Sequence, residues 1–133
     1  MSSLSANFAG NKIFPPLQNG VTVVAATDFS SNVCTLKMNP TSTAGQKQVL
    51  GSVITVTPGA GDDDLVLPPV AQCAGMILYV INSHASNNLE LKYVNASGSV
   101  AELSLAASDI AADEAAVCIC DGTLWYAIVT TAT

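Results

Sequence analysis

Apolar and polar residues alternate over short runs along most of the chain, as they do in β-strands that bury one face. In residues 89–94 the leucines and the tyrosine point one way, while Glu90 and Lys92 point the other. Turn residues separate such runs at intervals of about 8–12 residues, a spacing typical of sandwiches and barrels. The pattern predicts roughly eight or nine strands, at residues 21–25, 33–38, 49–57, 65–67, 75–82, 89–94, 100–105, 115–120 and 125–131.

Two of these runs, residues 75–82 and 115–120, are apolar at nearly every position. Such a run fits a central strand that is covered on both sides. The polar segment 41–46 is expected to be a loop, and the region 106–116 has no apolar stripe, so we allow it one helical turn at most. From residue 88 onward the strands are expected to form a meander. The prediction is one all-β domain over residues 21–133, a jelly-roll-like sandwich or barrel.

The closing hairpin is the clearest local signal. Asp121-Gly122-Thr123 is a turn sequence between the run 115–120 and the final strand. Trp125 begins that final strand, where a large ring can fix the hairpin to the opposite sheet. We therefore predict that Trp125 is a core anchor.

Residues 1–20 show no alternation, and Pro15-Pro16 exclude a helix and favour an extended chain. This segment is nevertheless too apolar for a free tail. It predicts an extended arm that lies on its own domain or on a neighbouring subunit. The residues expected to make this contact are Phe8, Ile13, Phe14, Pro15, Pro16 and Leu17.

The charge balance narrows the choice of partners. The 133 residues include ten acidic residues against four lysines and no arginine, for a net charge of −6. Phosphate groups are bound by clustered lysine and arginine, so the sequence argues against nucleic acid and against an anionic membrane. Only 11% of the residues are charged while 50% are hydrophobic. This predicts that part of the surface contacts other copies, and we expect a trimer.

Segments that would direct the chain to a membrane are not evident in the sequence. No apolar run approaches the roughly 20 residues of a spanning helix. The N-terminal residues lack the basic start and apolar core of a signal peptide. We expect a protein that is made in a cytosol-like compartment.

Residues that could carry catalysis are sparse. The one histidine, His84, stands in a polar turn, and no nucleophile-elbow or phosphate-binding glycine motif occurs. The four cysteines form no C-x-x-C pair and fit free, buried thiols. We therefore expect a non-enzymatic protein with no cofactor.

The run Asp62-Asp63-Asp64 could supply oxygen ligands to a divalent cation. The alternating spacing of an EF-hand is missing, however, and Gly61 precedes the acidic residues instead of following them. A solvated turn is the preferred interpretation, and these three residues remain weak candidates for a metal site.

Residues 65–128 contain a characteristic series of turns and strands. A Leu-Pro pair leads to a glycine-started strand that ends in Val-x-Asn, and a second alternating strand, a glycine turn and a closing D-G-T-x-W-x-x-I hairpin follow. The positions are Leu67-Pro68, Gly75, Val80 to Asn82, Leu89 to Val94, Ser97-Gly98, Asp121 to Thr123, Trp125 and Ile128. In this series the chain resembles a family of small β-structured virion proteins of tailed bacteriophages.

Proteins of this kind are trimeric modules on phage heads or at the tips of tail fibres. The resemblance implies a capsid decoration (cement) protein that binds the major capsid protein at capsomer junctions, on the outer surface of the virion. The alternative is a receptor-binding module of a tail fibre or spike. Decoration is favoured by the single short domain without a fibre shaft, by the N-terminal arm and by the scarcity of aromatic residues.

Overall fold

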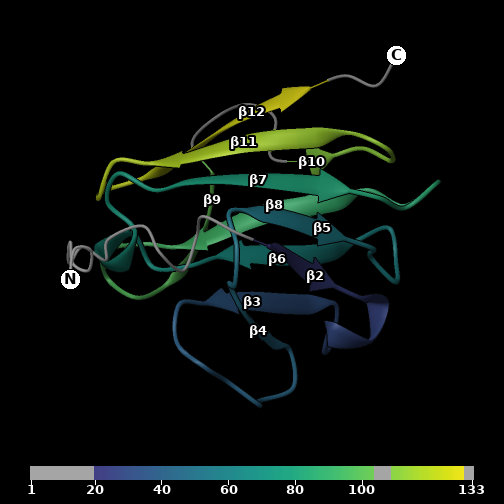
Figure 1. Cartoon of the computed structure of the whole chain (residues 1–133), viewed down its shortest axis with the longest axis horizontal. Helices are drawn as coiled ribbons and strands as arrows, with labels where there is room; N and C mark the ends of the chain where they lie inside the picture. The colour runs from purple at the N-terminus through teal and green to yellow at the C-terminus, as the bar shows by residue number, and fades with distance from the viewer. Residues whose placement is uncertain (1–19, 104–108, 131–133) are drawn as a thin grey trace, which may run out of the picture.

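The computed structural model describes residues 20–103 and 109–130, and its regular structure is almost entirely β. The strands form two sheets (Figure 1). The first sheet has the order β12-β11-β7-β5-β2, and its strands are β2 Val21–Val24, β5 Val53–Val56, β7 Ile77–Asn82, β11 Ala115–Cys120 and β12 Trp125–Thr130. The predicted arm, residues 1–20, lies outside the described residues except for Gly20.

The second sheet has the order β10-β8-β6-β3-β4, and β9 also pairs with β8. Its strands are β3 Val33–Lys37, β4 Gln46–Gln48, β6 Asp63–Leu67, β8 Leu89–Val94, β9 Val100–Glu102 and β10 Asp109–Ile110. Two short 3₁₀ turns, η1 Ala26–Asp28 and η2 Val70–Gln72, join strands. No helix in the described ranges is long and apolar enough to cross a membrane.

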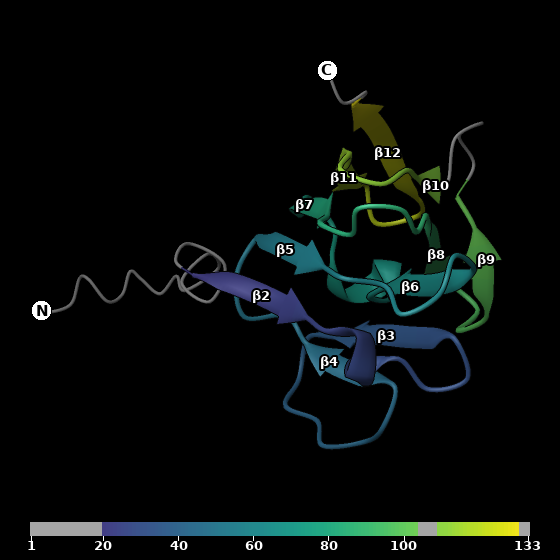
Figure 2. The ribbon, with the colours of Figure 1, turned by 90° about the vertical axis from the view of Figure 1, so that its right-hand side faces the viewer.

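Between β5 and β8 the chain passes from one sheet to the other with each strand. Figure 2 shows β2 and β5 in one layer and β3 and β6 in the other. Val53 pairs with Tyr79 in the first sheet and Leu65 pairs with Leu91 in the second, both in parallel register. For these two strand pairs the chain therefore advances by the same number of residues, from Val53 to Tyr79 and from Leu65 to Leu91.

The prediction of an all-β fold is confirmed, but its jelly-roll form is not. Jelly rolls are built from antiparallel Greek keys. Among the described residues, five of the nine strand pairings are parallel. Antiparallel pairing is confined to β7 with β11, β11 with β12, and β8 with β9 and β10.

Three details of the strand prediction are wrong. β4 begins at Gln46, the last residue of the expected loop, and pairs with β3 over residues for which no strand was predicted. β10 forms where one helical turn was allowed, and its Ile110 is fully buried. The expected meander is interrupted, because β9 and β10 both pair with β8 and β11 belongs to the other sheet.

The core between the sheets is one apolar cluster that includes Ile54 and Val80 of the first sheet and Leu65 and Leu91 of the second. Trp125 heads the largest fully buried side chains of the described residues. Its indole Nε1–H donates a hydrogen bond of 2.8 Å to the carbonyl oxygen of Pro68, just after β6. This bond ties the start of β12 to the chain that leaves the opposite sheet.

Candidate interaction face

The outer surface of the first sheet carries a row of apolar side chains that crosses all five strands. The strand register aligns Val21, Val53, Tyr79, Val117 and Ile128 side by side. Val21 is 48% exposed, Tyr79 44% and Ile128 60%. Side chains that are paired in register point to the same side of a sheet, so this row is continuous.

The flanking rows are mostly apolar, with Thr55 and Thr130 as polar members. Val23, Thr55, Ile81, Ala115 and Thr130 form one of them, and Ile77, Ile119 and Tyr126 form the other. No member of the three rows is charged. We call this surface the apolar face, and it consists of Val21, Val23, Val53, Thr55, Ile77, Tyr79, Ile81, Ala115, Val117, Ile119, Tyr126, Ile128 and Thr130.

The sequence interpretation of residues 75–82 needs correction here. The run was expected to be a strand covered on both sides. In the single chain β7 is central in its sheet, but Ile77 and Tyr79 of its outer side are exposed. Only the inner side of β7 is therefore buried in the core, and apolar residues of its outer side are left exposed.

The second sheet presents a charged outer surface instead. Asp64, Glu90 and Asp109 lie side by side on β6, β8 and β10. Lys92 pairs with Asp64 at 2.9 Å and with Glu102 at 3.8 Å. Desolvation raises the pKa of Glu90, Lys92 opposes the shift, and the neighbouring acidic residues add to it. The two outer surfaces of the molecule thus differ sharply in charge.

The three aspartates of the candidate metal site are separated by the fold. Asp63 is only 2% exposed, and its carboxylate accepts hydrogen bonds from the backbone N–H of Gly59 at 2.6 Å and of Ala60 at 3.1 Å. Asp64 points to the other side of β6 and pairs with Lys92, while Asp62 is exposed. Among the described residues, no group of three or more His, Cys, Asp or Glu side chains is placed to hold a metal ion.

The contacts of His84 and the burial of the cysteines indicate that these residues stabilise the fold. The Nδ1 atom of His84 accepts hydrogen bonds from the backbone N–H groups of Ser86 and Asn87, at 3.0 and 2.9 Å, and so holds the turn before β8. All four cysteines are free and buried. Burial raises the pKa of three of these thiols to about 12, which keeps them protonated and weakly nucleophilic at neutral pH. The three are Cys34, Cys73 and Cys118.

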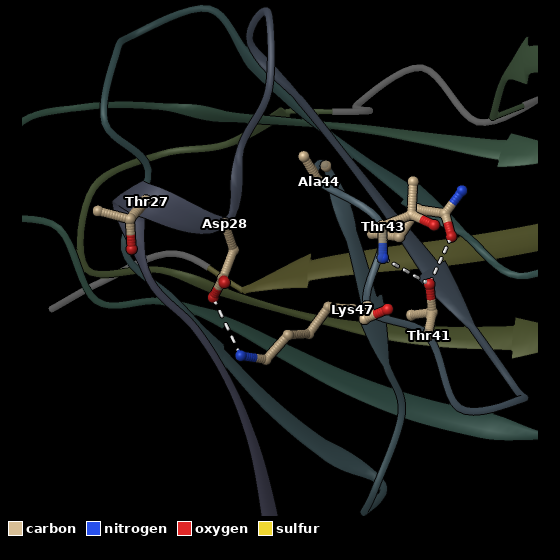
Figure 3. A pocket seen from close by; sticks show the side chains of 9 residues that line it. Thr27, Asp28, Thr41, Thr43, Ala44 and Lys47 are labelled. Carbon is tan, nitrogen blue, oxygen red and sulfur yellow. Dashed lines mark hydrogen bonds and ion pairs between the residues drawn. The ribbon is translucent and has the colours of Figure 1, made fainter.

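A hollow of about 300 Å³ lies between η1 and the loop that leads into β4. Figure 3 shows that its polar side chains bond to one another. Lys47 Nζ pairs with Asp28 Oδ2 at 3.1 Å, and the hydroxyl of Thr41 donates to Gln46 Oε1 at 2.7 Å. These contacts brace the loop.

Comparison with known proteins found no matching family model, no similar curated protein and no similar solved structure. The apolar face is the candidate interaction site that the described strands present. The sequence pattern identified two of the strands that form the apolar face, at residues 75–82 and 115–120. It had not found the contributions of β2, β5 and β12, because the strand order was not known.

Proposed function

We propose that the chain is a non-enzymatic virion structural protein that decorates the capsid of a tailed bacteriophage. In this role it binds the major capsid protein at capsomer junctions, on the outer surface of the head, and stabilises the particle. The apolar face is the observation that carries the proposal. A contiguous apolar patch across five strands is the mark of a protein that works in an assembly.

The residues that carry the family resemblance support a scaffolding role. Trp125 bonds to Pro68, and the N–H of Gly75 donates to the carbonyl of Cys120 at 2.8 Å. A side chain at Gly122 would come within 3.1 Å of Ala74. These residues close turns and pack segments together, which is the task of a structural module.

Valency explains how such a module would hold a capsid. A small trimer at a junction touches several capsid subunits at once, so weak contacts combine through a high effective concentration. In this proposal the arm of residues 1–20 adds apolar area through Phe8, Ile13, Phe14 and Leu17. Pro15-Pro16 lower the cost of ordering the arm, because they hold it extended before it binds.

A reconstitution experiment tests this proposal. Purified chain is added to heads that were assembled without it, and the heads are sedimented and then heated. We expect the chain to sediment in a fixed ratio to the capsid protein and to raise the temperature at which the heads release DNA. A chain that stays in the supernatant at tens of micromolar would contradict the proposal.

The arm is tested in the same assay with a variant that lacks residues 2–17. We expect this variant to bind heads more weakly than the full chain. If the variant binds heads with unchanged affinity, the arm does not contribute to capsid binding. The rest of the proposal is then tested by the binding of the full chain to heads.

A further inference from the structure

We propose that the apolar face is covered by a second copy of this chain, so that the free protein self-associates through this face. The inference deepens the proposed function, and it rests on that function only in taking the chain to be an assembly protein. It leaves other surfaces of the molecule to meet the capsid.

The distribution of charge favours a second copy as the occupant. Two chains that each carry a net charge of −6 repel one another. Contact through the second sheet would bring the acidic row of Asp64, Glu90 and Asp109 close to its own copy. Contact through the apolar face places no like charges opposite each other. A basic partner, by contrast, would find nothing on this face to pair with.

The exposed side chains of the central row are spread over the whole width of the sheet. Val21 and Ile128 stand on the two edge strands and Tyr79 on the central strand, and all three are exposed. Covering them takes a partner surface as wide as a five-stranded sheet, and a second copy of this chain supplies a surface of that width.

The size of the face sets the expected strength of association. Five strands about 4.8 Å apart and about five residues long, at about 3.3 Å per residue, span roughly 400 Å² in projection. Stable, specific interfaces bury about 800 Å² on each partner. The face alone thus covers about half of that area, so we expect weak association that depends on concentration in the micromolar range.

The test measures the mass of the full chain by sedimentation equilibrium from 1 to 100 µM, alongside matched lysine variants. Ile128→Lys and Tyr79→Lys place a charge on the apolar face. Val100→Lys adds the same charge at β9 of the second sheet, where Val100 is 56% exposed, close to the 60% of Ile128. Thermal unfolding followed by circular dichroism verifies that each variant is folded.

We expect the wild-type chain to exceed its monomer mass of 13.6 kDa as the concentration rises. Both face variants should raise the dissociation constant at least about tenfold, because each buries an unpaired charge, and Val100→Lys should not. Wild-type chain that is monomeric at 100 µM would overturn the inference, as would association that both face variants leave unchanged. Association that appears only when residues 2–17 are removed would assign the face to the chain's own N-terminal segment, and would overturn it too.

The two proposals fail separately. A monomeric chain that still binds heads contradicts self-association and leaves the decoration role standing. A chain that associates through the apolar face but ignores heads contradicts the decoration role and leaves this inference standing.

Discussion

Replacing Trp125 with phenylalanine tests whether the closing hairpin is held by this one side chain. The indole is fully buried, and its Nε1–H donates to the Pro68 carbonyl at 2.8 Å. Phenylalanine keeps most of the apolar bulk but cannot donate. Trp125→Phe therefore leaves a buried carbonyl without its partner and opens a small void beside it.

The expected loss follows from these two changes. An orphaned buried hydrogen-bonding group costs about 1–3 kcal/mol, and the missing ring atoms add about 1 kcal/mol. Trp125→Phe should lower the free energy of unfolding by roughly 2–4 kcal/mol. Trp125→Ala adds a large cavity and should lose about 4–8 kcal/mol, comparable to the whole stability of a typical domain.

Urea unfolding followed by far-ultraviolet circular dichroism is the suitable assay, because Trp125 is the only tryptophan and its fluorescence is lost in the variants. Protein is kept at 1 µM, so that association does not contribute. Tyr126→Phe is the control, since its half-buried ring remains and only a weak 3.5 Å contact with Asp121 is removed. A Trp125→Phe protein within about 0.5 kcal/mol of wild type would refute the anchor role.

Three further predictions concern buried and charged groups. Asp63→Ala should lower the free energy of unfolding in urea by about 3 kcal/mol, because the N–H groups of Gly59 and Ala60 lose their acceptor. Asp62→Ala should stay within about 0.5 kcal/mol of wild type. Equal losses for the two variants would show that the buried Asp63 carboxylate does not stabilise the fold more than Asp62 does. At pH 8 a colorimetric disulfide reagent should modify the four thiols only after denaturant is added, because they are buried and three have a pKa of about 12; rapid reaction of the native protein would contradict this. The raised pKa of Glu90 means that the folded chain binds this proton more tightly than the unfolded chain does, so ionisation destabilises the fold. Glu90→Gln should therefore raise the melting temperature at pH 7 and lose this advantage below about pH 4, and a constant difference across this range would refute the reasoning.

Alternation of apolar and polar residues predicted strand positions well. It gave β8 with the bounds that the structure has, because a period of two reports directly on a half-buried strand. The bounds of β11 were also predicted correctly, but from a continuous run of small apolar residues. It failed for β4, whose sequence Gln46–Gln48 is polar throughout, and for the two-residue β10. Strands that are so short or lie at an edge leave too few buried positions to form a pattern.

The pattern could not reveal strand partners. The parallel pairs β5–β7 and β6–β8 arise because the chain crosses from one sheet to the other with each strand between β5 and β8, and no local residue preference records that crossing. The same limit applies to the apolar face. Val21 and Ile128 are more than a hundred residues apart in sequence, and only the strand order places them in one row.

The alternation of side chains along a strand also explains why the acidic run does not form one cation site. In the sequence Asp62, Asp63 and Asp64 form one cluster of charge that could face a cation together. Because successive side chains of a strand point in opposite directions, Asp63 turns inward to the Gly59 turn and Asp64 outward to Lys92. Adjacent carboxylates on a strand do not converge.

The location of the chain in an intact virion tests the decoration proposal most directly. A gold label on a cysteine introduced at Ser97, in the exposed turn between β8 and β9, can be seen by electron microscopy. The proposal predicts label repeated over the head surface at symmetry-related positions. Label confined to a few copies at the tail would contradict decoration and would favour the receptor-binding alternative.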